Sequence, residues 1–147
     1  MAALPDLQLF NAAKNDLTGI VPPLGSEALH TLDLQHNRLE GPIPEHLAEN
    51  NPNLVKLDLS HNEFHGILPV HITSLHFLRF LDLSYNRLEG SIPVRIGDMK
   101  VLQGLFLNNN LFVGTIPLTM TRDDLQIVQL FLEHNRLSGT VPIELAR

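Results

Sequence analysis

Residues 78–93, LRFLDLSYNRLEGSIP, set the frame for the whole chain. Counted from Asn86, leucines stand eight, five and three positions earlier and two positions later, and glycine stands four positions later. Isoleucine and proline follow six and seven positions after it. The same frame fits around five further asparagines, which are Asn15, Asn37, Asn62, Asn110 and Asn135. Successive asparagines are 22 to 25 residues apart, so six copies of one unit fill the chain.

Each unit also carries a second motif after its asparagine. It reads GIVP, GPIP, GILP, GSIP, GTIP and GTVP, beginning at residues 19, 41, 66, 90, 114 and 139. Units of this length with the pattern L-x-x-L-x-L-x-x-N-x-L are typical of leucine-rich repeats, and the G-x-I-P motif makes this chain resemble the plant-type class. The resemblance implies an α/β fold, a leucine-rich repeat solenoid or horseshoe with a parallel concave β-sheet, forming one domain over residues 1–147.

The repeat predicts its own local structure. The alternation of leucine with polar residues before each asparagine indicates a strand with one buried face. We expect the asparagine to turn the chain, because asparagine tolerates left-handed geometry, and we expect its amide to lie in a buried ladder. The glycine permits a positive φ. After the proline, segments such as VRIGDM should form a helical turn or two on the outer side.

Composition narrows the classes of partner. A net charge of −6 and a pI near 5.7 argue against nucleic acid and anionic membrane surfaces. There is no cysteine, hence no disulfide and no thiolate metal site. No apolar stretch approaches the ~20 residues that a membrane span needs, so we expect no membrane contact by this segment. The resemblance implies an extracellular or cell-surface location if the chain belongs to a plant-type receptor.

The two ends of the chain depart from the regular pattern. The first copy has Ala12 where the others have leucine, and a cysteine-bearing cap of the kind usual in plant-type ectodomains is missing. We interpret the chain as a fragment, or as a protein that pairs end to end. Either interpretation predicts poorly covered apolar residues in the outer copies, namely Leu7, Phe10, Ala12, Leu132, Leu137 and Val141.

Catalysis and metal binding have little support in the sequence. Asp58, Ser60 and His61 are the residue types of a hydrolase triad, but all three fall on one strand and its turn, without a cleft or an oxyanion hole. His61 and His65 have the spacing of zinc ligands only if a helix brings them together. His36 and His61 on neighbouring strands could bind a metal only weakly. We therefore predict no catalytic residue, no metal site and no cofactor.

The candidate binding residues are those that the frame directs away from the core. Four positions before the asparagine stand Asn11, Asp33, Asp58, Asp82, Phe106 and Phe131, and directly before it stand Lys14, His36, His61, Tyr85, Asn109 and His134. The aspartates belong to the LDL motif that is common in this family, so we interpret them as scaffold, with a basic or hydroxyl-rich ligand as the functional alternative. Exposed aromatic side chains that a fold does not require favour a partner site. We predict a ligand-binding patch of Phe80, Tyr85, Phe106 and Phe131, flanked by His61 and His134.

Two classes of function remain. The first is a non-catalytic recognition module that holds a protein, a peptide or a glycan on the concave sheet, as the resemblance to plant-type receptor ectodomains implies. The second is a structural solenoid that associates end to end through uncapped ends, without a dedicated ligand. The flanking histidines add a hypothesis of pH-dependent binding between pH ~5 and 8.

Overall fold

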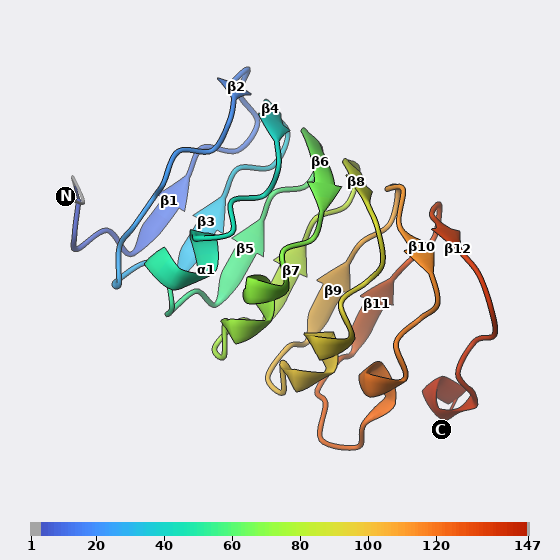
Figure 1. Cartoon of the computed structure of the whole chain (residues 1–147). Coiled ribbons are helices and arrows are strands. Elements are labelled where there is room, and N and C mark those ends of the chain that lie inside the picture. The colour runs from blue at the N-terminus through green and yellow to red at the C-terminus, as the bar shows by residue number, and fades with distance from the viewer. Residues whose placement is uncertain (1–3, 147) are drawn as a thin grey trace.

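The computed structural model describes residues 4–146, and the repeats form a stack of coils with one strand each in a common parallel sheet (Figure 1). The strand order β1-β3-β5-β7-β9-β11 follows the chain. Identical frame positions pair across the sheet, as Asp58 with Asp82 and Asp82 with Phe106. The strands are β1 (Leu9–Asn11), β3 (Thr31–Asp33), β5 (Lys56–Asp58), β7 (Phe80–Asp82), β9 (Gly104–Phe106) and β11 (Gln129–Phe131). The solenoid fold predicted from the repeats is confirmed.

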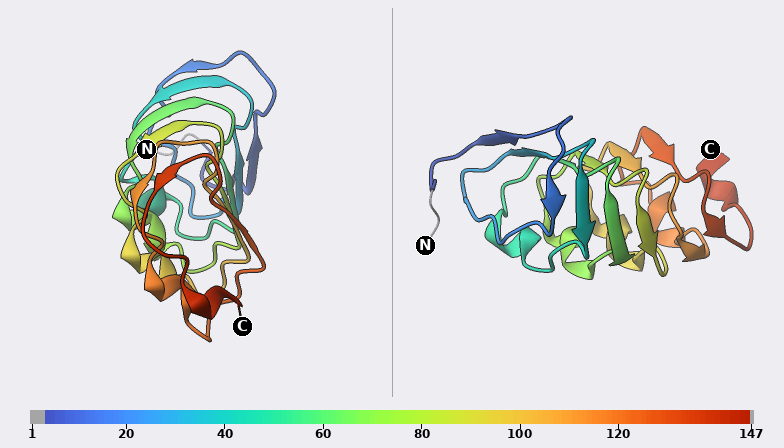
Figure 2. Two further views of the ribbon diagram at one scale, coloured as in Figure 1. Left: turned by 90° about the vertical axis from the view of Figure 1, so that its right-hand side faces the viewer. Right: turned by 90° about the horizontal axis from the view of Figure 1, so that it is seen from above.

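The return part of each coil contributes a second layer of parallel pairing, which the sequence analysis did not predict. A four-stranded sheet contains β2 (Thr18–Gly19), β4 (Arg38–Gly41), β6 (Glu63–Ile67) and β8 (Arg87–Glu89), and a two-stranded sheet pairs β10 (Val113–Gly114) with β12 (Arg136–Leu137). These short strands run beside the main sheet, on another side of each coil (Figure 2).

Short helical segments complete the coils on the side away from the main sheet (Figure 2). They are α1 (Leu47–Asn50) and the 3-10 turns η1 (Val70–Ser74), η2 (Val94–Asp98), η3 (Leu118–Thr121) and η4 (Ile143–Ala146). A proline stands directly before η1, η2 and η3, where its fixed φ suits the start of a helical turn. No helix in the described range 4–146 is long and apolar enough to cross a membrane.

The core runs through the middle of the stack and consists of the repeated leucines. Leu57, Leu81 and Leu105 are fully buried at the same position of three successive strands. Each buried leucine contributes roughly 1.5 to 3 kcal/mol of burial free energy. Because neighbouring coils cover one another, the outer coils are covered on one side only. Leu7, Phe10, Ala12, Leu132 and Leu137 are accordingly only partly buried and Val141 is exposed, as the sequence predicted.

The repeated asparagines link each coil to the one before it. The Oδ1 of Asn86 accepts the backbone N–H of Phe64, and its Nδ2 donates to the carbonyls of Leu59, Leu83 and Ser84 at 3.0 to 3.2 Å. Asn37, Asn62, Asn110 and Asn135 repeat this pattern. The predicted burial is confirmed for the first three of these and for Asn86, whereas Asn135 is only partly buried in the outermost coil.

The predicted left-handed turn at the asparagine is wrong by one residue. The residue before each asparagine has the positive φ, between 52 and 58°, and these residues are Lys14, His36, His61, Tyr85, Asn109 and His134. The asparagine amide must point into the core to satisfy the neighbouring coil, so the reversal of direction falls on the residue that points outward. The six motif glycines do have a positive φ, as predicted, between 77 and 85°.

Candidate recognition surface

The outward side of the main sheet, called the concave face below, presents the residues that the frame directs away from the core. Parallel pairing in one register places equal positions of successive repeats side by side. Along this face the third to fifth strands therefore carry Asp58, Asp82 and Phe106 in one row, with Lys56, Phe80 and Gly104 in the next row. The character of the face changes from charged to aromatic between β5 and β9.

Three phenylalanines form a cluster on β7, β9 and β11, called the phenylalanine cluster below. Phe106 stacks on Phe131 with ring centroids 5.2 Å apart. Phe80 and Phe106 both lie over Gly104, where an added Cβ would come 2.9 and 2.8 Å from their rings. Phe80 and Phe131 are 37% and 43% exposed although the core does not need them. Gly104 was missed by the sequence analysis, although glycine inside a strand often marks a close approach.

Tyr85 belongs to a different group. Its ring stacks on His61 at 4.1 Å, and His61 stacks on His36 at 4.0 Å, both nearly parallel. These three residues share the left-handed position, which aligns their side chains in one column at the ends of the strands. The four aromatic residues predicted as one patch are thus divided between this column and the phenylalanine cluster. His134 occupies the same column beyond Asn109 and has no stacked ring partner among the described residues.

The stack affects the protonation of its central ring. Burial lowers the pKa of His61 below its ordinary value of 6.5, and the neighbouring His36 lowers it further, against the opposing charges of Asp82 and Asp58. Between the lowered pKa and 6.5 the unfolded chain binds more protons than the folded chain, so stability is lost as the pH falls through this window.

We expect His61→Asn to reduce this acid sensitivity. Asparagine tolerates the left-handed φ of 53° at this position but carries no titratable ring. The free energy of unfolding of the wild type, measured in urea, should fall more between pH 7.5 and pH 5 than that of the variant. Equal losses in the two proteins would show that the stack does not govern the response.

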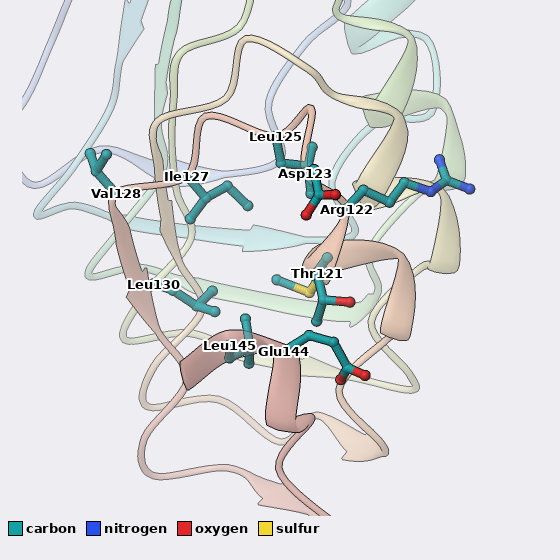
Figure 3. Close-up of a pocket in the computed structure, with 10 residues that line it drawn as sticks. Thr121, Arg122, Asp123, Leu125, Ile127, Val128, Leu130, Glu144 and Leu145 are labelled. Atoms are coloured by element: carbon teal, nitrogen blue, oxygen red, sulfur yellow. The ribbon is translucent and has the colours of Figure 1, made fainter. Parts of the chain in front are cut away.

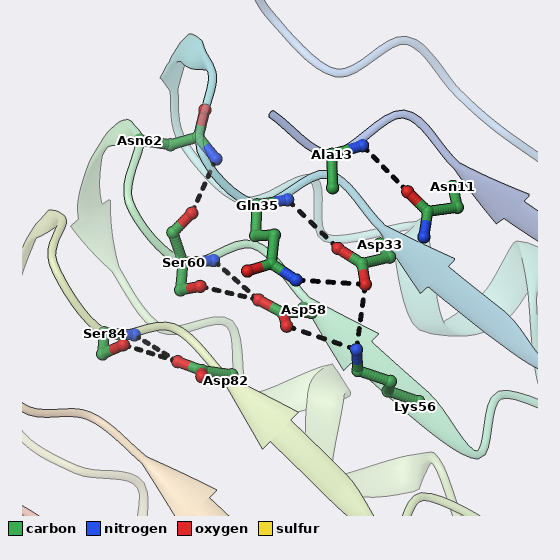
Figure 4. A network of polar contacts seen from close by, with 10 residues as sticks. All are labelled: Asn11, Ala13, Asp33, Gln35, Lys56, Asp58, Ser60, Asn62, Asp82 and Ser84. Carbon is green, nitrogen blue, oxygen red and sulfur yellow. Dashed lines mark hydrogen bonds and ion pairs between the residues drawn. The ribbon is translucent and has the colours of Figure 1, made fainter. Parts of the chain in front are cut away.

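The aspartates on the concave face brace turns, as the scaffold interpretation predicts (Figure 4). Asp58 accepts the N–H and hydroxyl of Ser60 at 3.2 and 2.7 Å, and Asp33 accepts the N–H of Gln35 at 3.3 Å. Lys56 lies between the two carboxylates, 2.9 Å from Asp33 and 3.4 Å from Asp58. Burial alone would raise the pKa of Asp33, but the hydrogen bonds from Lys56 and Gln35 outweigh it and lower that pKa.

Asp82 is the third of these carboxylates and has a different environment. Its Oδ1 accepts the N–H and hydroxyl of Ser84 at 2.9 and 2.6 Å, which repeats the turn of Asp58. No lysine or arginine within residues 4–146 forms an ion pair with it. Burial raises its pKa above the ordinary value, Asp58 adds to this, and the bonds from Ser84 oppose it.

Asp58, Ser60 and His61 are not arranged as a hydrolase triad. The hydroxyl of Ser60 donates directly to Asp58, and His61 turns its ring face to Tyr85 and His36. A serine–histidine–carboxylate relay is therefore not formed. Over the described residues, no group of three or more histidine or acidic side chains is placed to hold a metal ion. The rings of His36 and His61 are stacked with an angle of 11° between their planes, so their in-plane nitrogen lone pairs lie in two separate planes and do not converge on one ion.

A cavity of about 430 Å³ lies in the last coil, and none of the predicted site residues lines it (Figure 3). It is lined by Met120, Thr121, Arg122, Asp123, Leu125, Ile127, Val128, Leu130, Glu144 and Leu145. The guanidinium of Arg122, one of the lining residues, forms an ion pair with Asp98 at 2.8 Å. The cavity is formed between the segment before β11 and η4.

Comparison with known proteins agrees with the repeat frame. The leucine rich repeat family model matches residues 27–88. The ectodomain of the Arabidopsis thaliana membrane receptor kinase GASSHO1/SCHENGEN3, in complex with CASPARIAN STRIP INTEGRITY FACTOR 2, is 36% identical over 97% of this chain and 17% of its own, with a TM-score of 0.89. The plant peptide hormone receptor RGFR1, in complex with RGF2, is 32% identical over 96% of this chain and 23% of the receptor chain, with a TM-score of 0.90.

A smaller structure matches over most of its own length. In the BIR3–SERK2 complex from Arabidopsis thaliana, the matched chain is 34% identical over 88% of this chain and 69% of that one, with a TM-score of 0.78. No curated protein matches the chain. The chain belongs to the leucine-rich repeat family, in the class found in plant receptor ectodomains. It spans less than a quarter of the chains of the two larger receptors.

Proposed function

We propose that the chain is a non-catalytic recognition module that binds an extended peptide segment on its concave face, at the phenylalanine cluster. The observation that carries this proposal is the exposure of Phe80 and Phe131 on a group of three neighbouring strands, where Phe131 stacks on the partly buried Phe106. Aromatic side chains bury much apolar area on binding at a small cost in side-chain entropy, and they are enriched at the centres of interfaces.

The similar structures support a peptide or protein as the partner. RGFR1 is a peptide hormone receptor in complex with RGF2, and BIR3 forms a complex with SERK2. A location outside the cell or at its surface is part of the same proposal, because GASSHO1/SCHENGEN3 is a plant membrane receptor with this repeat in its ectodomain. In the proposal Tyr85, His61 and His134 flank the bound segment at the strand ends, while Phe80, Phe106 and Phe131 anchor it.

A phage-displayed library of random peptides tests the proposal. Peptides selected on the wild type should bind the Phe106→Ala, Phe131→Ala double variant at least thirtyfold more weakly. The reason is that truncating a central aromatic anchor typically costs about 2 kcal/mol or more. Affinity measured by calorimetry gives the comparison.

The matched control is Val94→Ala with Leu118→Ala. These exposed apolar residues, 65% and 69% accessible, also belong to successive coils but stand on η2 and η3, away from the concave face. The control pair should keep the wild-type affinity within about twofold. If the control pair weakens binding as much as the phenylalanine pair does, the proposed site is wrong.

A further inference from the structure

Each of three neighbouring strands ends in an aspartate that uses one oxygen in the same way. Oδ1 accepts hydrogen bonds from the residue two positions later, in Asp33 from Gln35 and in Asp58 and Asp82 from a serine. This is the turn-bracing function of aspartate, and it needs only a hydrogen-bond acceptor. Asn11 performs it in the first coil by accepting the N–H of Ala13 at 3.0 Å.

The second oxygen distinguishes the three aspartates (Figure 4). The Oδ2 atoms of Asp33 and Asp58 share the ammonium group of Lys56, which stands one row away on β5. The Oδ2 of Asp82 has no hydrogen bond and no ion pair within residues 4–146. The next strand has Gly104 in the row of Lys56, so it supplies no cation to Asp82.

This carboxylate oxygen adjoins the phenylalanine cluster. Asp82 pairs with Phe106 across the sheet, and Phe80 stands two residues earlier on the same face of β7. Burial and the like charge of Asp58, which stands beside it on β5, raise the pKa of Asp82, whereas the bonds from Ser84 to Oδ1 and the nearby His61 oppose this rise. An ammonium or guanidinium group paired with Oδ2 of Asp82 would offset both the burial of its charge and the repulsion from Asp58. The same group would also face aromatic rings.

We propose that Asp82 is the cation-binding subsite of the recognition surface, and that the peptide it takes carries a lysine or arginine next to an apolar residue. The basic group pairs with Oδ2 of Asp82, while the apolar neighbour packs on Phe106 and Phe131. This inference rests on the proposed function of the concave face and adds the chemical class of its ligand. Lys56 bound between Asp33 and Asp58 shows the same type of pair made within the chain.

Selection of the same phage-displayed peptides on the wild type and on Asp82→Asn tests the subsite. Peptides from the wild type should be enriched in lysine or arginine beside an aromatic or aliphatic residue, and they should bind Asp82→Asn about tenfold more weakly. Selection on Asp82→Asn should lose the basic enrichment and keep the apolar one. The variant should fold normally, because the amide oxygen of asparagine can accept the N–H and hydroxyl of Ser84, and Asn11 already accepts the equivalent N–H of Ala13 in the first coil.

Asp58→Asn is the matched control, because it removes one negative charge just as Asp82→Asn does. Its Oδ2 already faces Lys56, so the wild-type peptides should bind this variant within about twofold of the wild type. The subsite is overturned if the selected peptides lack basic residues, or if Asp82→Asn and Asp58→Asn bind them equally. Peptides that need Phe106 and Phe131 but ignore Asp82 would defeat this inference alone. Peptides that ignore the phenylalanines would defeat the proposed function.

Discussion

Asn86→Ala is expected to lower the free energy of unfolding by about 1 to 3 kcal/mol, because the buried N–H of Phe64 loses its acceptor and three carbonyls each lose one donor. Its amide satisfies the N–H of Phe64 and the carbonyl of Leu59 in the preceding coil, as well as two carbonyls of its own turn. Alanine would leave the buried N–H of Phe64 without this acceptor, which costs about 1 to 3 kcal/mol. The three carbonyls keep a second donor each, from Asn62, Asn110 and the N–H of His61. Because the lost bonds join two coils, the loss should affect the cooperativity of the whole stack.

Asn15→Ala is the matched control for this prediction. Asn15 occupies the same frame position, but it is exposed and its side-chain amide donates only to the carbonyls of Ala12 and Ala13 in its own turn. Its loss should cost less than about 1 kcal/mol. Urea unfolding followed by circular dichroism measures both. A loss at Asn86 no larger than the loss at Asn15 would contradict the view that the amides hold neighbouring coils together.

Gly97→Ala is expected to destabilise the chain, although alanine favours helical geometry over glycine. A Cβ at Gly97 in η2 would overlap the carbonyl oxygen of Thr119 in η3. Backbone atoms form this contact, so the two coils would have to separate, and overpacking of this kind costs about 1 to 3 kcal/mol. The hydroxyl of Thr119 also donates to the carbonyl of Val94, which holds the two turns in close contact.

Gly25→Ala separates this packing effect from the general effect of replacing glycine. An added Cβ at Gly25 would come no closer than 3.5 Å to Asn50, an ordinary contact, and Gly25 does not have a positive φ. This variant should be neutral or slightly stabilising, since it reduces the freedom of the unfolded chain. Urea unfolding of the two variants at equal pH makes the comparison. A similar loss of stability in both would disprove the close approach of η2 and η3.

The main sheet could be predicted from the sequence because its determinants are periodic. Leu81, Asn86 and Gly90 recur in equivalent positions in nearly every coil, and an averaged pattern is sufficient to locate the strands, the ladder and the positive-φ glycine. The short strands of the return layer carry no comparable alternation. They form because stacking has already brought the coils within pairing distance.

The arrangement of the candidate site could be predicted only in part. The repeat pattern predicts that Phe80, Tyr85 and Phe106 point away from the core, but it does not predict the orientation of their side chains on that face. The left-handed backbone at Tyr85 places its ring against His61, and the missing side chain of Gly104 lets Phe80 and Phe106 lie over that strand. Both effects depend on single residues and their local conformation, which a repeat average does not contain.

The binding of a peptide at the phenylalanine cluster is tested most directly by chemical-shift mapping. The ¹⁵N-labelled chain would be titrated with a peptide selected from the phage-displayed library. The account predicts that the largest amide shifts occur in β7, β9 and β11, with Gly104 at their centre and the turns η2 and η3 unchanged. Largest shifts in η2 and η3, or around Glu144 in the cavity of the last coil, would contradict it.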